Sequence, residues 1–508
     1  MVPFLAVSKG VSVSISRGNK QAAAKGIGQF FCRKKSVFDH KVGALARCGK
    51  NRAKVPPLRG FAYFCPAFSI FFFPPKNSPL EFLHLHEDLV GRAFAWAVAQ
   101  NGPLCWLDSC GYSTYPYAQR ALLAGVGAVA ELEVPHGRTG DAFARLEEFL
   151  REKKQWSFGF LSYDLKNEIE KLTSVHADPL EFPEAYWFHA ETVLMFDGDK
   201  TWTVLSAHRD PAAIWAEILS TAPIPPAGPR APIAVRAEMD RETYLQRLAQ
   251  IRRHIVDGDV YELNFCQRFV VEGADWDAPA LYGRLNERSP APFSAYFRRG
   301  EKHLLCASPE RFLAKRGDLL VAQPIKGTAK RHPDPDTDRS VGESLRLSEK
   351  NRSENVMIVD LVRNDLARSC RPGTVQVEEL FGIYAFPQVW QMISTVTGRL
   401  RPEVSGLEAL RNAFPMGSMT GAPKVKSMEL IERYENAKRG LYSGAVGYFS
   451  PEGDFDFNVV IRSLLYDERL RRATFSAGGA IVYDSVPEEE YEECMAKTAG
   501  IRTVLGIE

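Results

Sequence analysis

Apolar residues recur at helix and strand spacings along the chain from about residue 80 onward. Residues 86–100 place apolar side chains on one helical face and therefore predict a helix. Residues 104–107 and 156–163 are short apolar runs that predict strands. Residues 192–196 and 201–205 flank the turn sequence Asp-Gly-Asp-Lys, a pattern that predicts a hairpin.

A proline cluster interrupts this pattern. Residues 223–232 contain five prolines, and proline lacks the amide hydrogen that a sheet needs, so the cluster predicts an extended connector. We therefore place a boundary at 220–236 and expect one region at 80–222 and a second at 237–508. The pattern leaves open whether the two regions share one sheet.

The second region carries longer periodic segments. Residues 241–256 predict a helix and residues 260–271 predict a strand. Residues 348–365 predict another helix, with a buried stripe and with Glu354 near its beginning. The stripe of the first helix is Leu245, Leu248, Ile251 and Ile255, and that of the second is Val356, Val359, Val362 and Leu366.

Composition adds the class of protein and excludes others. An apolar content of 45% and a charged content of 25% are typical of a soluble globular protein. The net charge of +2 conceals an asymmetry, because residues 1–80 hold fourteen Lys and Arg against one acid, which leaves the body at −11. An acidic body gives no electrostatic support for binding nucleic acid.

The N-terminal 79 residues differ from everything that follows. They are basic and almost free of acids, which predicts a disordered extension and also fits a transit peptide by composition. Their apolar run at 61–73 is too short to span a membrane, so we expect no membrane partner. The nine cysteines are scattered and form no C-x-x-C pair, which argues against a zinc site or a disulfide framework. A reducing, cytoplasmic location is the expectation.

A single lysine stands in an unusual local sequence. Lys326 lies in the run Gln-Pro-Ile-Lys-Gly-Thr, between a rigid proline and the permissive Gly327. An amine buried among apolar neighbours loses its proton more easily and can act as a nucleophile. A lysine that caps an ordinary turn is the alternative interpretation. Upstream, Glu310 lies in Ser-Pro-Glu-Arg-Phe, where it could serve as an acid or pair with Arg311 on a strand.

Carboxylates also converge near the C-terminus. Ser485 followed by Val-Pro-Glu predicts a helix start with a capping hydroxyl. Glu490, Glu493 and Lys497 then lie on one face of that helix. The face is either a solvated charged surface or part of a metal site.

These motifs together resemble the chorismate-utilising enzymes, the family of anthranilate, isochorismate, salicylate and aminodeoxychorismate synthases. The likeness is dense over 240–508 and thin over 80–220. It implies an α/β (α+β) fold in which large antiparallel sheets pack face to face with helices outside. Some members bind tryptophan in the N-terminal region, and the sequence leaves open whether Asp108-Ser109 and Ser162-Tyr163-Asp164 form such a pocket.

The resemblance implies roles for individual residues. It implies Mg²⁺ bound directly by Glu354 and Glu493 and reached through water by Glu490, and it gives Glu310 the role of the acid that protonates the leaving C4 hydroxyl. The residues implied in substrate binding are Gly327, Thr328, Tyr442, Arg462, Gly478 and Lys497. Thr420, in the signature Met-Gly-Ser-Met-Thr-Gly-Ala-Pro-Lys, is expected mainly to shape a loop.

With a lysine at position 326, the chain resembles those family members that aminate chorismate at C4 with ammonia, on the route to p-aminobenzoate and folate. In those members the resemblance implies that the lysine is a covalent nucleophile. Anthranilate synthases, which aminate C2 and eliminate pyruvate, usually carry a small residue there, and they are the alternative. Members that add water use a lysine where this chain has Glu262. Members that eliminate pyruvate commonly have a histidine where this chain has Gln391. No G-x-C-x-G glutaminase motif occurs, so a separate glutaminase subunit is the implied partner.

Overall fold

The structure, a computed structural model, describes residues 62–65, 69–72, 80–83, 88–112, 117–138, 140–225 and 233–507. The strands β1 (Ala62–Cys65) and β2 (Ser69–Phe72) pair antiparallel with each other. The rest of the segment 1–79 lies outside the described residues, so the extension predicted there stays a prediction.

The remaining strands form one hydrogen-bonded network in which every described pairing is antiparallel. The strands of the first region are β3 (Leu80–Leu83), β4 (Leu104–Asp108), β5 (Leu122–Val134), β6 (Ser157–Leu161), β7 (Ala185–Phe196) and β8 (Thr201–Ser206). Those of the second are β9 (Val235–Ala237), β10 (Glu262–Glu272), β11 (Phe293–Arg299), β12 (Lys302–Ser308), β13 (Arg311–Arg316), β14 (Leu319–Gln323), β15 (Ile325–Lys330), β16 (Gln376–Ala385), β17 (Val389–Arg399), β18 (Gly421–Ala422), β19 (Ala445–Phe449), β20 (Phe455–Asn458), β21 (Ser463–Asp467) and β22 (Arg472–Ile481).

Strand pairing joins the two regions on either side of the proline cluster. β4 pairs with β11, and β6 pairs with β19, so the first region contributes its strands to the same network as the second. The pairing order runs from β10 through β22, β21, β12, β11, β4, β5, β7, β6, β19, β20, β13 and β14 to β17. The question that the sequence left open is therefore answered in favour of a shared sheet.

Aromatic side chains fill the space where the sheet faces itself. Phe297 of β11 meets Phe160 of β6 edge to face, with ring centroids 5.2 Å apart, although these two strands are not hydrogen-bonded to each other. Tyr186 and Phe188 of β7 contact the same Phe297 ring. Edge-to-face rings of this kind are stabilised beyond their buried area. The predicted face-to-face sheets are confirmed.

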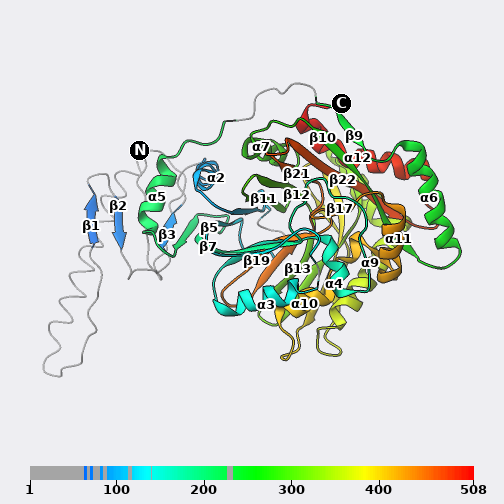
Figure 1. Ribbon diagram of the computed structural model, residues 1–508, viewed down its shortest axis with the longest axis horizontal. Coiled ribbons are helices and arrows are strands. Elements are labelled where there is room, and N and C mark those ends of the chain that lie inside the picture. The colour runs from blue at the N-terminus through cyan, green and yellow to red at the C-terminus, as the bar shows by residue number, and fades with distance from the viewer. Residues whose placement is uncertain are drawn as a thin grey trace.

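Helices cover the outside of the sheets (Figure 1). Helices α6 and α12 pack together over β10 and β22, and α7 contacts α12 while lying over β11 and β12; residues of all three share one apolar core. The described helices of four or more residues are α2 (Leu89–Ala99), α3 (Ala142–Glu152), α4 (Lys166–Ile169), α5 (Pro211–Ser220), α6 (Arg241–Val256), α7 (Ala278–Arg288), α8 (Pro335–Leu347), α9 (Glu349–Ala367), α10 (Gly406–Ala413), α11 (Lys424–Tyr434) and α12 (Pro487–Leu505). None of them is both long enough and apolar enough to cross a membrane.

Most predicted elements are confirmed, with local corrections. In α6, Leu248 and Ile251 are buried, and the stripe also includes Tyr244, which the apolar spacing missed. In α9, Val356 is 45% exposed, so its assignment to the buried stripe is wrong. The Ser485 side chain does not cap α12, because the N-cap position is Val486; the Ser485 hydroxyl instead donates to Glu490 Oε1 at 2.7 Å. The six described cysteines from Cys105 onward are free thiols, as their spacing predicts.

Candidate active site

Lys326 lies on β15, which pairs with β17 through an irregular register around Gly327. Gly327 has a φ of 98°, a left-handed conformation that favours glycine, and a Cβ there would lie 3.1 Å from the Asn351 side chain. The irregularity places Lys326 inside the protein, where the residue is only 9% exposed. A lysine that merely caps a surface turn is therefore excluded.

The Lys326 ammonium is paired with a carboxylate from another strand. Its Nζ donates to Glu262 Oε1 at 2.6 Å, and Glu262, at the start of β10, is 1% exposed. Burial alone would lower the pKa of Lys326, but the Glu262 carboxylate beside it, with further negative charge from Glu354 and Glu310, holds that pKa above its ordinary value. The expectation that burial among apolar neighbours frees the amine of its proton is wrong, because these neighbours are acidic.

Glu310 lies just before β13 and is 5% exposed. Burial raises its pKa to about 7, although the positive charges of Lys326 and Arg462 oppose the shift. The alternative pairing with Arg311 is wrong, since the Arg311 guanidinium instead binds Asp456, with Nε–Oδ1 at 2.9 Å and Nη2–Oδ2 at 3.1 Å. A carboxyl group that is half protonated near neutral pH can give a proton to a leaving group.

The predicted carboxylate face of α12 lies against the end of β22. An added Cβ at Gly479 would lie 3.2 Å from Glu490 Oε2 and 3.8 Å from both Glu493 Oε1 and Lys497 Nζ. Lys497 donates to the Gly478 carbonyl oxygen at 2.8 Å and forms an ion pair with Glu493 at 2.8 Å. Glu490 is buried and is bound by Ser485 and Lys350. The face therefore combines one buried carboxylate, Glu490, with two partly solvent-exposed side chains, Glu493 and Lys497, and its role in metal binding stays a prediction.

The predicted magnesium ligands, Glu354 and Glu493, differ in how their surroundings affect their charge. Burial raises the pKa of Glu354 on α9 to about 7, and the nearby Glu493 charge adds to the shift. The Glu493 side chain is 49% exposed; its partial burial would raise its pKa, but Lys497 holds that pKa below its ordinary value. Among the described residues, no three acidic, His or Cys side chains are close enough to ligate one ion, and lysines balance these carboxylates. Mg²⁺ is commonly held by one or two carboxylates with water in its remaining positions, and the metal itself stays a prediction.

Arg462 and Glu310 lie near each other. Burial lowers the pKa of Arg462, and the Glu310 charge opposes that change. Arg462 adopts a φ of 49°, which is costly for a residue with a side chain, and strained backbone of this kind is concentrated at functional sites. Its guanidinium makes no hydrogen bond to a described residue, so it is free to bind an anion.

The other residues implied in substrate binding differ in their surroundings. Tyr442 is buried, with its hydroxyl 3.4 Å from Cys266 Sγ. Gly478 pairs with Cys266 across β10 and β22, and a Cβ there would lie 2.0 Å from the Phe265 carbonyl oxygen. That close approach requires glycine independently of any ligand. Thr328 pairs with Gln391 across β15 and β17 and is exposed.

Comparison with known proteins shows the family of this chain. A family model of chorismate binding enzymes matches residues 105–503. The aminodeoxychorismate synthase component 1 of Klebsiella aerogenes is 39% identical over 345 residues, which is 67% of this chain and 75% of that protein. The chain belongs to the chorismate binding enzyme family. The chloroplastic aminodeoxychorismate synthase of Arabidopsis thaliana is 45% identical over 264 residues, 51% of this chain but only 28% of that protein.

A solved structure of the same family agrees as well. Anthranilate synthase component I from Streptococcus pneumoniae superposes with a TM-score of 0.66 and 26% identity, over 75% of this chain and 91% of that chain. The face-to-face sheets and the outer helices are therefore those of a chorismate-utilising enzyme.

Several polar side chains of this family member were not predicted as site residues. Among the described residues, Glu262 Oε2, Asn355 Nδ2 and Gln391 Oε1 are buried without a hydrogen-bond partner. Most buried polar atoms are satisfied, so such a group points to a missing ligand or water. The motif comparison had marked the positions of Glu262 and Gln391 only by the residues that relatives carry there. Periodicity gave no signal for Glu262, because nearly every residue of β10 is buried on both faces. Lys350 resembled any other charged residue near a helix start.

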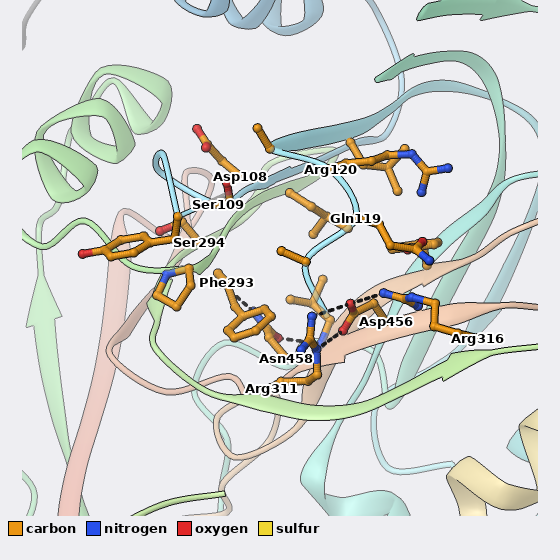
Figure 2. A pocket seen from close by; sticks show the side chains of 18 residues that line it. Asp108, Ser109, Gln119, Arg120, Phe293, Ser294, Arg311, Arg316, Asp456 and Asn458 are labelled. Atoms are coloured by element: carbon orange, nitrogen blue, oxygen red, sulfur yellow. Dashed lines mark hydrogen bonds and ion pairs between the residues drawn. The ribbon is translucent and has the colours of Figure 1, made fainter. Parts of the chain in front are cut away.

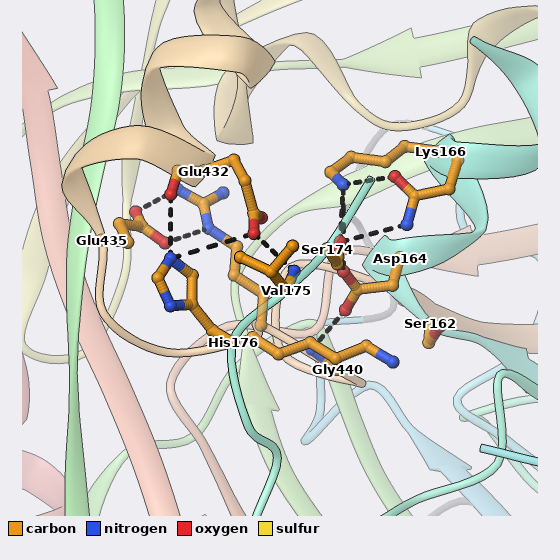
Figure 3. A network of polar contacts seen from close by, with 12 residues as sticks. Ser162, Asp164, Lys166, Ser174, Val175, His176, Glu432, Glu435 and Gly440 are labelled. Carbon is orange, nitrogen blue, oxygen red and sulfur yellow. Dashed lines mark hydrogen bonds and ion pairs between the residues drawn. The ribbon is translucent and has the colours of Figure 1, made fainter. Parts of the chain in front are cut away.

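The first region supports the loop that carries Tyr442. Asp164 Oδ2 accepts from the Gly440 amide at 2.8 Å, and Lys166 Nζ donates to Asn167 and Ser174 (Figure 3). Burial raises the pKa of Asp164 and lowers that of Lys166. The Tyr163 amide donates to the Gly440 carbonyl oxygen at 2.8 Å, and the Ser162 hydroxyl donates to Glu184, which also accepts from Lys438.

A separate cavity of about 90 Å³ lies between the two regions (Figure 2). Asp108 and Ser109 line it from the first region, and Phe293 and Asn458 line it from the second. Ser162, Tyr163 and Asp164 do not line it. The two segments considered together from sequence therefore lie in different places, and neither Lys326 nor Glu310 borders this cavity.

Proposed function

We propose that this chain aminates chorismate at C4 with ammonia to give 4-amino-4-deoxychorismate, for p-aminobenzoate and folate synthesis, through a covalent intermediate on Lys326. The single observation that carries the proposal is a buried lysine, paired with the Glu262 carboxylate and near a carboxyl group, Glu310, whose pKa is raised to about 7. The names of the relatives also support it.

The proposed first step is a substitution on the ring. The Lys326 nitrogen bonds to C2, the ring double bonds shift, and the C4–O bond breaks. Glu310 gives a proton to the leaving oxygen, which departs as water. In the second step ammonia bonds to C4, the double bonds shift back, and the C2–N bond to Lys326 breaks.

Other side chains would bind and orient the substrate. Arg462 and Tyr442 would hold the side-chain carboxylate, and the Gly478 amide would contact the substrate. When bound at Glu354 and Glu493, with Glu490 reached through water, Mg²⁺ would supply positive charge for the ring carboxylate. Gly327, Thr328 and Lys497 are proposed to contact the substrate as well, with Lys497 positioned by its bond to the Gly478 carbonyl oxygen.

The ammonia is proposed to come from a separate glutaminase subunit. The name of the Klebsiella relative, component 1, supports the existence of a second component. The cytoplasmic location stays a prediction.

Product identification tests the proposal directly. The chain is incubated with chorismate, Mg²⁺ and ammonium, and the product is identified by mass and absorbance. The expected product keeps the enolpyruvyl group and carries nitrogen at C4. Release of pyruvate with anthranilate would instead establish the alternative, C2 amination. Lys330→Ala is the matched control, because Lys330 lies on the same strand but is exposed; it should behave as wild type, whereas Lys326→Ala should lose C4 amination.

A further inference from the structure

Resting on the proposed function, we infer that Glu262 is a catalytic base that takes a proton from Lys326 before the lysine attacks and returns it when the lysine leaves. Nothing in the family resemblance assigns this position a role in amination. A nucleophilic lysine must lose its proton, and the surroundings of Lys326 favour the protonated form. A proton acceptor in direct contact is therefore required.

Geometry singles out Glu262 among the acidic groups around the amine. The groups that face Lys326 are Glu262 from β10, Glu310 from the turn before β13, Glu354 from α9 and Glu493 from α12. Of these, Glu262 alone is hydrogen-bonded to Nζ in the described structure, at 2.6 Å. That separation lies within the range for direct proton transfer.

The second carboxylate oxygen gives an independent indication. Glu262 is only 1% exposed, and its Oε2 atom is buried without a hydrogen-bond partner among the described residues. A carboxylate that served only as a structural counter-ion would be expected to have both oxygens satisfied. An acceptor free on one side can also take a hydrogen bond from an N–H of the incoming ammonia or of the lysine adduct.

The protons balance over the whole cycle. In the first step Glu262 accepts one proton from the Lys326 ammonium, the amine forms the C2–N bond, and Glu310 gives its proton to the departing oxygen. In the second step Glu310, now a carboxylate, takes a proton from ammonium, and the ammonia so formed bonds to C4. Lys326 leaves as the amine and recovers its proton from Glu262. The sum is chorismate plus ammonium giving the aminated product plus water.

The test is Glu262→Gln, which keeps the shape and an oxygen that can accept from Lys326. Chorismate and Mg²⁺ are mixed with the protein without ammonia, and the rate of lysine adduct formation is followed by intact-protein mass at several pH values. Loss of the base should slow adduct formation at pH 7 by about 10²- to 10⁴-fold. The remaining rate should rise about tenfold per pH unit, since only free amine then reacts. Glu272→Gln, the same change at the exposed end of β10, should leave the rate unchanged.

A different result is expected if Glu262 does not act as a base. If Glu262 is only a counter-ion, removing its charge lowers the pKa of Lys326, more free amine is present, and the adduct forms as fast as in wild type or faster. That outcome overturns the inference and leaves the proposed function intact. Glu262→Ala gives a second measurement: added formate should restore part of its lost rate, and absence of rescue in a folded variant counts against the base. A wild-type protein that aminates C4 without any adduct overturns the covalent step itself.

Discussion

The ion pairs Arg439–Glu435 and Lys326–Glu262 are both buried, but their remaining polar atoms differ. Arg439 donates to both oxygens of Glu435, at 2.9 and 2.6 Å, and also to the carbonyl oxygens of Met419 and Asn264. In the second pair, Glu262 keeps one oxygen without a partner. The first pair thus has the full set of bonds that a structural pair needs, whereas the second is incomplete until another molecule arrives.

This difference distinguishes a buried ion pair that stabilises the fold from one that can take part in a reaction. Arg439 joins the loop of Met419 to β10 and to the segment that leads to Tyr442, so its role is to hold the site together. Lys326, Glu262 and Glu310 instead have surroundings that shift the pKa values of Lys326 and Glu310 without satisfying every atom. Such shifts are concentrated at functional sites.

The largest effect is expected for Glu310→Gln. Glutamine cannot donate a proton to the leaving oxygen, so amination should fall by about 10²- to 10⁴-fold. Steady-state assays with chorismate, Mg²⁺ and ammonium measure the loss, and a thermal melt checks that the protein is folded. Activity close to wild type would place the acid elsewhere and remove Glu310 from the reactive group.

The next effect is on stability, for Glu435→Gln. This change leaves the Arg439 charge buried without its partner, which should lower the free energy of unfolding by about 3–5 kcal/mol. Denaturant titration measures it. Glu343→Gln breaks a solvent-exposed pair with Arg346 and should leave the unfolding midpoint unchanged. If Glu435→Gln were as stable as wild type, the contrast between the two buried pairs would not hold.

A smaller effect is expected for Glu493→Gln. Removing one of few carboxylates should raise the Mg²⁺ concentration for half-maximal activity by at least about tenfold. Glu492→Gln, on the neighbouring exposed position of α12, is the matched control. Superimposable Mg²⁺ titrations for the Glu493 variant and wild type would reduce this helix face to a solvated surface.

The last effect concerns the pH dependence of stability. Glu310 has a folded pKa of about 7, above its ordinary value near 4.5, so the folded state binds a proton that the unfolded chain releases. Its contribution to stability is therefore complete below about pH 4.5 and is lost as pH rises to about 7. Glu310→Gln should flatten this part of the curve of unfolding free energy against pH. An unchanged curve would mean that Glu310 is not buried as a neutral acid in solution.

The sequence identified the candidate reactive residues better than it identified the residues that contact them. Lys326 and Glu310 stand in distinctive local motifs, and the 3.6-residue period brought Glu490, Glu493 and Lys497 to one face. The period does not say how an individual side chain packs, so Val356 was placed wrongly in the buried stripe of α9.

Contacts between segments that are distant in sequence could not be predicted from local sequence patterns. Lys326 and Glu262 are 64 residues apart, and only the strand pairings bring them together. The electrostatic surroundings of the lysine could not be foreseen for this reason, which is why its pKa was expected to fall rather than rise. Ser485 had the composition of a helix cap, but its hydroxyl binds a side chain of the helix instead of a backbone amide.

The most direct test of the account is intact-protein mass after mixing with chorismate and Mg²⁺ in the absence of ammonia. The account predicts a covalent adduct that peptide mapping places on Lys326, and its disappearance when ammonium is added. Lys326→Arg keeps the charge but cannot deprotonate, so it should bind chorismate without forming an adduct and should aminate poorly. A Lys326→Arg protein that aminates chorismate at the wild-type rate would contradict the account, because Lys326 would then be only a counter-ion.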